Sequence, residues 1–579
     1  MEKLGSPGPA HPLQGEGPVA GVSVAKTAGV VGDEEATLPS SKLFRCACVR
    51  RWLPLVYREE LHEVLRLTGP LVLSRILSFL QQFVISIFCG HIGNAELAGY
   101  ALAVATLHVT TIAPGYGLAV ACDTLISQTY GGKNLKRVGV ILQRSSLILL
   151  LFCVPCWGLL INSQNLLLVM HQEDEVALFL HQLQVSYLQN QGIILPQMYT
   201  AAVANVLNLA FNYVLIFSLD LGVVGSAIAN SLSQITICLL LFGYIRWKKL
   251  HRQTWGGCTT DSLQEWGSYM KLALPSALMI CFEWWIWEVG GFLAGVLGEE
   301  DLAAQHIIAE VGAISYMFPF GIHAAACVRV GNALGAGDTE RAKVTCKVAL
   351  IMAGKYKHTY YRSRPLKIFI ASGGLTVYTF VQFFDALLCV STGILIGSGM
   401  QKFAACINLV SYYCIGLPVG VALMFFANLR ILGFWLGIIV CSSIQTCCFI
   451  GLIFKLNWKK ITHKVGCSYV SLKSQNYLYT VSRCAQLNSD GTSKTNVYSP
   501  VNTQDQDKNT KPEKLLSTSQ LILRRGFTLS LAVLALVVGI AFHIAFPPPE
   551  PRAQGWANFT QNFTSDFTPT PLILLNQNV

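Results

Sequence analysis

The chain has 579 residues, of which 53% are hydrophobic and only 13% are charged, with a formal net charge of +11. Soluble proteins carry roughly 25% charged residues, and a single soluble core stops growing near about 250–300 residues. These values exclude a soluble enzyme, a nucleic-acid-binding domain and a disordered scaffold. We therefore expect an all-α polytopic membrane protein.

The N-terminal tail is rich in Gly, Pro and Ala over its first 40 residues, and no basic stretch is followed by an apolar core. A secretory signal peptide needs both of these features. We therefore expect residues 1–54 to be a disordered tail in the cytosol, without a cleaved signal.

Eleven stretches are long and apolar enough to cross a bilayer, which takes about 20 helical residues. They are residues 67–90, 97–121, 138–161, 196–219, 221–245, 270–297, 302–327, 376–397, 403–427, 430–454 and 526–546. Two further stretches are doubtful, because 176–195 carries His181 and several Gln, and the segment between 342 and 375 contains many Lys and Arg. The sequence thus predicts 11 to 13 membrane spans.

Lys and Arg in the short loops predict the orientation, since these residues gather on the cytosolic side of a membrane. Basic clusters precede the first span and recur in alternate loops at 133–137, 246–252, 341–347 and 455–460, whereas the intervening loops contain few of them. This alternation places the N-terminus in the cytosol and requires residues 176–195 to cross.

The segment 461–523 is rich in Ser, Thr, Asn, Gln and Lys and has no periodic apolar face. Such a composition is typical of a disordered linker. With this linker in the cytosol, the last helix, 524–548, runs outward and leaves an extracellular tail at 549–579. The tail contains two N-glycosylation sequons, at Asn558 and Asn562.

The chain repeats itself at an offset of 205 residues. The matches are Pro70 with Pro275, 90–97 with 295–302, Cys122 with Cys327 and, at an offset of 204, 128–137 with 332–341. Six apolar stretches per half let both halves enter from the same side, related by a pseudo-twofold axis along the membrane normal. We predict two six-helix lobes, 55–250 and 251–460, plus a thirteenth helix, which is typical of a secondary transporter.

Carboxylates within the spans distinguish the two halves, because the second half has four and the first has essentially none at mid-span. The four are Glu283, Glu288, Glu310 and Asp385. An ionisable group inside a bilayer is unfavourable and by default suggests a functional site, although a single neutral carboxyl can also serve as a packing group. The sequence therefore predicts the transport site in the second half.

Helical spacing places an indole beside two of these carboxylates. Trp287 follows Glu283 by four residues, and Glu288 follows Trp284 by four, so each pair shares a helix face. The two Glu lie roughly 140° apart around the helix. A carboxylate beside an aromatic ring suits a weakly hydrated organic cation, and the alternative is that both Trp pack in the core or against lipid.

The same carboxylates predict proton coupling. Desolvation favours the neutral form of a carboxylic acid, which can then exchange a proton near neutral pH. A bound cation favours the ionised form, and this competition is the minimum requirement of an antiporter.

The sequence offers no clear motif for nucleotide hydrolysis, metal binding or redox chemistry. The sequence has no Walker A motif, no HExxH motif and one isolated Cys-x-x-Cys. We therefore expect no enzyme, no metal and no cofactor besides the coupling proton. Asp123 is expected to form an ion pair with Arg137 or Arg144 rather than to take part in transport.

Several long motifs resemble those of the multidrug and toxin extrusion (MATE) family, in particular its vertebrate proton/organic-cation antiporters. The matching stretches are SIFCGHIGNAEL at 86–97, ACDTLISQTYGGKNLKRVGVILQRS at 121–145, P-S-x-L-M-x-C-x-E-W-W-x-x-E at 275–288, CVRVGNALGAGD at 327–338 and YYCIGLPVGVAL at 412–423. By this resemblance, Glu283, Glu288 and Glu310 fall on the family's essential intramembrane glutamates. Asp385 stands where the family usually has Glu, and Cys89 matches a functionally sensitive Cys.

The resemblance implies a secondary active antiporter that exchanges protons for small organic cations across the plasma membrane, on its apical face. We expect it to act as a monomer, to contact membrane lipids and to bind no nucleic acid.

Two other functions stay open. A lipid-linked-saccharide flippase has a related architecture, but it would favour a cationic groove for a diphosphate. A non-transporting variant is the second, because the fourth span is short and rich in Gln. The ninth span is replaced by AGKYKHTYYRSRPLKIFIASGG at 353–374, which has five Lys or Arg within 13 residues.

Overall fold

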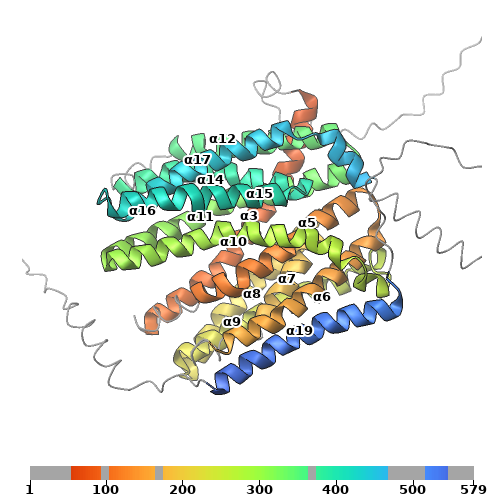
Figure 1. Cartoon of the computed structure of the whole chain (residues 1–579), viewed down its shortest axis with the longest axis horizontal. Helices are drawn as coiled ribbons and strands as arrows, with labels where there is room; N and C mark the ends of the chain where they lie inside the picture. Colours follow the sequence, from red (N-terminus) through yellow and green to blue (C-terminus); the bar gives the residue numbers. More distant parts are fainter. Residues whose placement is uncertain are drawn as a thin grey trace, which may run out of the picture. The chain divides into compact units, whose positions relative to one another are not determined.

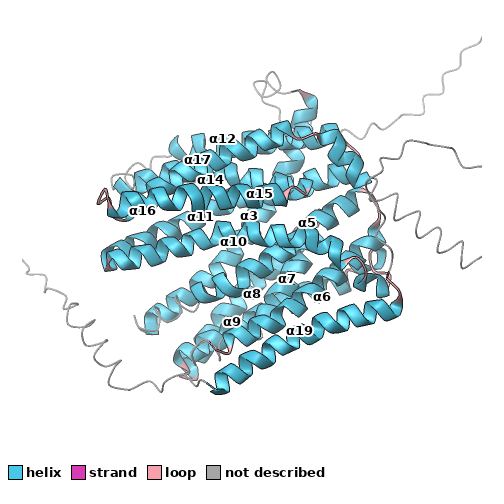
Figure 2. Cartoon of the chain, viewed as in Figure 1, coloured by secondary structure: helices cyan, strands magenta, loops and turns pink. Residues whose placement is uncertain are grey.

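The computed structural model describes residues 54–92, 104–162, 174–257, 259–362, 373–466 and 516–545. All of these belong to the larger of the two units into which the chain divides, Pro54–Val579. The described residues are helical almost throughout and contain no strand (Figure 2). The all-α fold that the composition predicts is confirmed.

The N-half has six helical elements. They are α3 (Leu55–Ile92), η1 with α5 (His108–Ile112 and Ala113–Gly131), α6 (Leu135–Leu160), α7 (Asp174–Gln189), α8 with η2 (Leu195–Tyr213 and Val214–Ser218) and α9 (Gly222–Trp247). Two short 3-10 helices, η3 (Leu250–Gln253) and η4 (Thr260–Leu263), connect this half to the next.

The C-half has six matching elements, and one helix follows it. They are α10 (Trp266–Leu297), α11 (Glu299–Gly335), α12 (Thr339–Arg362), α14 (Gly373–Ser398), α15 with η5 and α16 (Gln401–Asn408, Leu409–Gly416 and Leu417–Phe425), α17 (Ile431–Lys455) and finally α19 (Thr518–Ala545). In Figure 1 the colour gradient follows this order from red to blue.

Eleven helical segments of the described chain are long and apolar enough to cross a membrane, and each overlaps one of the 11 predicted spans. The two doubtful segments also form helices. α7 has 16 residues, a length of about 24 Å, which is shorter than the roughly 30 Å hydrocarbon core. α12 has 24 residues, but Lys355, Lys357 and Arg362 make its second part polar.

The duplication is visible in the packing, since corresponding helices make corresponding contacts. α5 packs on α6 and on α7 in the N-half, as α11 packs on α12 and on α14 in the C-half. α7 and α8 both contact α9, as α14 and α16 both contact α17. The short α7 therefore occupies the position that the repeat assigns to the fourth span.

The two halves are joined by a crossed pair of helix contacts. The first helix of each half packs on the second helix of the other, α3 on α11 and α10 on α5, the latter pair lying side by side in Figure 1. Gly117 on α5 faces Ala277, and Gly321 on α11 faces Val72, in both cases without room for a Cβ. Val72 and Ala277 are themselves 205 residues apart, so the repeat extends to the interface.

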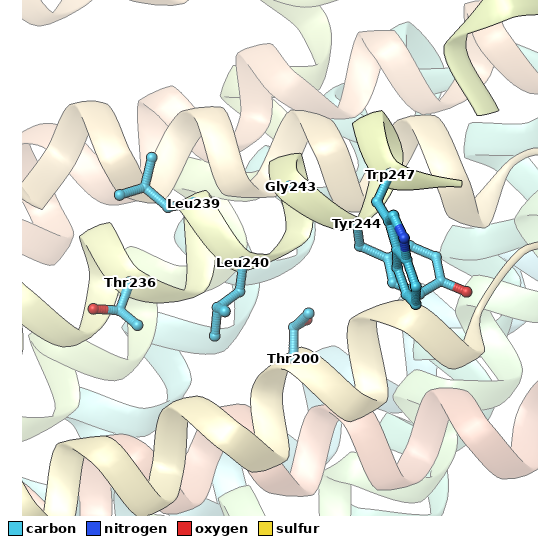
Figure 3. Close-up of a pocket in the computed structure, with 7 residues that line it drawn as sticks. All are labelled: Thr200, Thr236, Leu239, Leu240, Gly243, Tyr244 and Trp247. Atoms are coloured by element: carbon cyan, nitrogen blue, oxygen red, sulfur yellow. The ribbon is translucent and has the colours of Figure 1, made fainter. Parts of the chain in front are cut away.

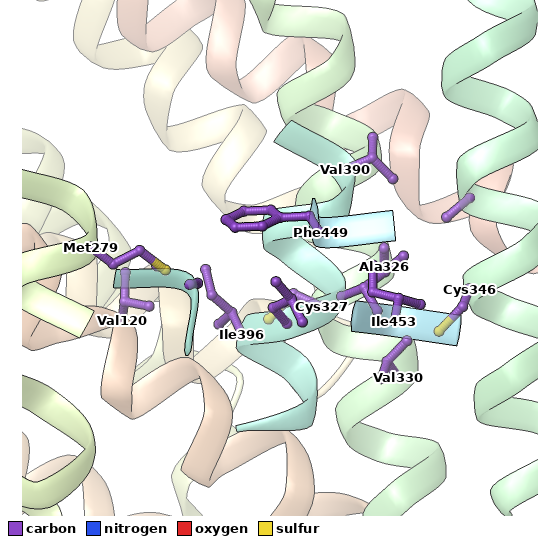
Figure 4. Packing of buried hydrophobic residues seen from close by; sticks show 14 of the residues in the cluster. Val120, Met279, Ala326, Cys327, Val330, Cys346, Val390, Ile396, Phe449 and Ile453 are labelled. Atoms are coloured by element: carbon purple, nitrogen blue, oxygen red, sulfur yellow. The ribbon is translucent and has the colours of Figure 1, made fainter. Parts of the chain in front are cut away.

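The largest apolar cluster also crosses this interface. Most of its buried residues belong to the C-half, but Ala113 and Val120 come from α5. Figure 4 shows Val120 beside Met279 and Ile396, from α10 and α14. Burial of apolar surface therefore links the halves along the middle of the helices.

The thirteenth helix, α19, lies along α6 (Figure 1). Gly158 and Gly539 face each other where these helices cross, and a Cβ at Gly539 would collide with the backbone of Gly158. Asn162 Nδ2 donates to the carbonyl oxygens of both glycines at 2.9 Å. Small residues that allow close backbone approach are a common means of helix association in membranes.

Replacement of Gly539 with Leu is therefore expected to separate α19 from α6 and to destabilise the folded protein by about 1–3 kcal/mol, as overpacking usually does. Thermal unfolding in detergent measures the effect. Gly526→Leu is the matched control, because a Cβ at Gly526 meets nothing within 4 Å. Equal melting temperatures for the two variants would contradict the assigned contact.

Candidate transport site

Glu283 on α10 and Asp385 on α14 both lie inside the C-half, and α11 packs against the helices of both. The two carboxylates are near enough to interact electrostatically, and both side chains are half-buried. Tyr316 from α11 donates its hydroxyl to Glu283 Oε1 at 3.5 Å. Tyr412 from η5 lies within electrostatic range of both carboxylates. Four elements of the C-half thus converge on these two carboxylates, which we call the acid pair.

Buried hydrogen bonds hold the backbone on either side of the acid pair. Asn408 Nδ2 donates to the Met279 carbonyl at 3.0 Å, and Gln445 Nε2 donates to Asn408 Oδ1 at 2.5 Å. Thr446 Oγ1 donates to the Phe384 carbonyl, next to Asp385, at 3.1 Å. α15 and α17 therefore fix the helices that carry the two carboxylates.

Glu288 faces the N-half instead. Its Oε1 lies 3.7 Å from His108 Nδ1 on η1. Trp284, one turn earlier on α10, stacks on Tyr116 from α5 with ring centroids 5.2 Å apart, and its centroid lies 6.1 Å from that of His108. We call these four residues the interhalf aromatic cluster. It combines a carboxylate with three aromatic rings, a composition that suits an organic cation.

The acid pair and the interhalf aromatic cluster share α10. Glu283 and Glu288 project toward different partners, as their angular separation of roughly 140° on one helix requires. Glu288 and Trp284 thus lie on the face of α10 toward the N-half, whereas Glu283 lies on its face toward α11.

The structure separates the other predicted residues from these two groups. Trp287 packs on Trp435 of α17, with ring centroids 5.7 Å apart, and lines an apolar cluster of the C-half. Glu310 on α11 is half-buried, and the described residues include no hydrogen-bond or ion-pair partner for its carboxylate. The Cys89 side chain lies outside the described residues, as do Asn558 and Asn562.

The expected partners of Asp123 are wrong. Arg137 and Arg144 both bind Glu265, at 3.1 and 3.3 Å. Asp123 instead accepts a hydrogen bond from Asn190 Nδ2 at 2.7 Å. Asp123 therefore faces the end of α7, where Asn190 lies, and not α6.

Sequence reasoning also missed several polar side chains of the spans. Arg75 on α3 lies over the Phe320 ring of α11, with Cζ 4.7 Å from the ring centroid. Arg75 could have been found from the sequence, because an ionisable residue within an apolar stretch is the signal that identified the carboxylates. Tyr316 and Tyr412 carried no comparable signal, because Tyr is common in apolar spans.

A shallow groove of about 490 Å³ lies between α8 and α9 (Figure 3). It is lined by Thr200, Thr236, Leu239, Leu240, Gly243, Tyr244 and Trp247. Leu239 and Trp247 are exposed at its edge, as expected of a surface that faces lipid. The groove has no carboxylate and is not the predicted site. Among the described residues no group of three or more His, Cys, Asp or Glu could hold a metal ion.

Comparison with protein families gives a consistent result. The family model MatE matches residues 70–214 and 275–355. Multidrug and toxin extrusion protein 1 of Danio rerio is 43% identical over 88% of this chain and 95% of the relative. The Homo sapiens protein of the same name is 42% identical over 89% of this chain and 97% of the relative.

Solved structures are similar as well. The eukaryotic MATE transporter AtDTX14 superimposes with a TM-score of 0.64 at 25% identity, over 71% of this chain and 99% of that protein. A multidrug resistance MATE family transporter in an outward-facing conformation gives 0.58 at 16% identity, over 70% and 97% of the two chains. The latter likeness concerns the fold alone.

Removal of the Asn408 amide tests the support of the acid pair. Asn408→Ala leaves Gln445 Nε2 and the Met279 carbonyl without their partner, which is expected to lower the free energy of unfolding by about 1–3 kcal/mol. Chemical or thermal unfolding measures this loss. Thr236→Ala is the control, since half-buried Thr236 lines the groove between α8 and α9 and its hydroxyl bonds within its own helix. Equal losses in both variants would contradict a supporting role.

Proposed function

Since the chain belongs to the multidrug and toxin extrusion family, we propose that it exchanges protons for organic cations. The family assignment includes multidrug transport across a membrane and excludes an enzyme. The observation that carries the finer proposal is the acid pair, two carboxylates of the C-half that lie within electrostatic range of each other on α10 and α14, the two helices against which α11 packs.

The chemistry of the acid pair supports exchange. Two neighbouring carboxylates repel each other when both are ionised, and either a proton or an organic cation relieves this repulsion. Once one ligand has relieved this repulsion, the other binds more weakly, so the two compete for one site. Tyr316, which donates a hydrogen bond to Glu283, stabilises the ionised form that a cation requires.

The interhalf aromatic cluster supports the choice of an organic cation. Stacked Trp284 and Tyr116 present π-faces beside Glu288, and such faces attract weakly hydrated cations. A metal ion would instead need several oxygen, nitrogen or sulfur ligands in close order. A lipid-linked saccharide would need cations rather than carboxylates around its diphosphate.

We further propose that the basic ends of the helices face the cytosol, in a plasma membrane. The protein then binds protons from the outer fluid and releases organic cations there, as a monomer with an extracellular C-terminus that is glycosylated at Asn558 and Asn562. The positive-inside rule supports this orientation.

Glu283→Gln and Asp385→Asn each retain volume and hydrogen bonding but remove a titrating charge. Both variants are expected to lose tetraethylammonium uptake driven by an imposed pH gradient, while surface biotinylation detects normal amounts of protein. Glu63→Gln is the control, because Glu63 lies near the start of α3 beside Arg66. Normal gradient-driven uptake in both site variants would refute the proposal, and uptake that ignores the gradient would refute proton coupling.

Trp284→Ala is expected to weaken the binding of organic cations by about 0.5–2 kcal/mol. The dependence of uptake on the pH gradient is expected to stay unchanged. The concentration of tetraethylammonium that gives half-maximal uptake measures this effect. Trp287→Ala is the comparison, since Trp287 packs on Trp435. A larger loss of affinity in the Trp287 variant would reverse these two roles.

The short α7 and the polar second part of α12 motivate the alternative of a non-transporting variant. That alternative would be established if this chain reaches the cell surface but transports nothing, while a form with both spans restored to family length is active.

A further inference from the structure

Two buried or partly buried carboxylates join the halves where the basic loops meet. Glu60, near the start of α3, accepts hydrogen bonds from Arg329 Nε at 2.9 Å and from Arg341 Nε at 3.4 Å. Glu265, directly before α10, accepts from Arg137 at 3.1 Å and Arg144 at 3.3 Å. In each case the carboxylate belongs to one half and both arginines belong to the other.

One pair of each arrangement is related by the sequence repeat, whereas Arg329 and Arg144 stand at unrelated positions. Glu60 and Glu265 are 205 residues apart, which is the main offset of the repeat. Arg137 and Arg341 are 204 residues apart, the offset that applies after the single-residue shift. The pairs are therefore crossed copies of one interaction, from the start of the first helix of each half to the start of the third helix of the other.

The helices beneath these pairs are in backbone contact. Gly131 at the end of α5 faces Asn332, and Gly335 at the end of α11 faces Gln128, with no room for a Cβ at either glycine. Ser127 is fully buried against Gly331 in the same place. This end of the interface between the halves is thus closed by close packing as well as by charge.

We infer that these groups are two latches, each built around one repeat-related pair, that hold the halves together at the basic ends of the helices. The first latch is Glu60 with Arg329 and Arg341, and the second is Glu265 with Arg137 and Arg144. The inference rests on the proposed transport function, together with the rocking of one half against the other that is typical of transporters built from repeats. Both latches must open for the site to become accessible from this end.

The physical basis is the hydration of the charges. Separated ions are unfavourable while the interface is dry, so the closed state keeps them paired. Once the halves part, water reaches the ions and replaces the lost pairing. The latches therefore stabilise the closed state without preventing the open one. Opening requires that both latches separate.

The latches differ in burial. The Glu60 side chain is 5% exposed, and Thr345 Oγ1 donates to it at 2.7 Å as a third partner. The Glu265 side chain is 22% exposed. Because loss of a partner is more harmful for the more buried charge, the first latch is expected to resist opening more strongly.

Accessibility of a thiol at position 127 tests this inference directly. Ser127→Cys places a thiol in the closed interface, and peptide mass spectrometry measures its reaction with a polar maleimide in lipid nanodiscs, where both faces are accessible. Glu265→Gln and Glu60→Gln are each expected to accelerate labelling by roughly 5-fold or more, and the double variant more than either. Labelling of native Cys346, buried within the C-half core, must stay slow and so reports global unfolding.

Arg341→Gln and Arg137→Gln provide a second route, should removal of the buried Glu60 charge impair folding. Arg341 is 51% exposed, so its loss leaves the rest of the first latch intact. Glu340→Gln is the matched control, because the 76% exposed Glu340 pairs with Lys343 on its own helix. The inference would be overturned if position 127 is labelled at the same rate in the folded latch variants as in the control.

Tetraethylammonium exchange measured on the same preparations keeps the two proposals separate. If the wild-type protein shows no proton-driven exchange but the latch variants are labelled faster, the latches are supported and the antiporter is refuted. Normal exchange in the wild type with unchanged labelling in every variant would refute the latches alone.

Discussion

The crossed packing of the two halves is the constraint on which the rest of the structure depends. The first helix of each half lies against the second helix of the other, and glycines at both crossings bring the backbones together. α10 consequently has one face in the C-half and another against α5. A single helix can thus present Glu283 to the interior of its own half and Glu288 to the N-half.

This arrangement explains how a duplicated chain holds an asymmetric site. The backbone repeats, but at the main offset the N-half has Ser78 and Phe83 where the C-half has Glu283 and Glu288. A pair of neighbouring carboxylates in a membrane interior is tolerated only with hydrogen-bond donors or ligands at hand. The C-half supplies Tyr316 as such a donor. The duplication therefore accounts for the common framework of the two halves, while the carboxylates of the acid pair belong to the C-half.

Much of the fold followed from the sequence, because apolar length and the 205-residue repeat are properties of the chain itself. All 11 spans and the order of matched helices were predictable in this way. The positions of α7 and α12 needed the repeat, since neither helix is long and apolar enough to be recognised alone. The predicted partners of Asp123 were wrong because proximity in sequence does not show which face of α5 a side chain occupies, and Asp123 faces the end of α7.

The candidate site was predictable in its charged residues but not in its geometry. Carboxylates stand out in apolar spans, whereas the proximity of Glu283 to Asp385 depends on how α10 and α14 each pack against α11. His108 and Tyr116 join Glu288 and Trp284 only through contact between the halves. Neither residue type is unusual in a span, so no local pattern could have identified them.

Competition between a proton and a cation at the acid pair is the central claim, and proton release on binding tests it most directly. Tetraethylammonium added to the purified protein in weakly buffered solution near neutral pH is predicted to release protons in proportion to the cation bound, as a pH-sensitive dye can measure. Substitution of both carboxylates of the acid pair by their amides is predicted to abolish this release. Saturable binding of the cation by the wild-type protein without proton release would contradict the account.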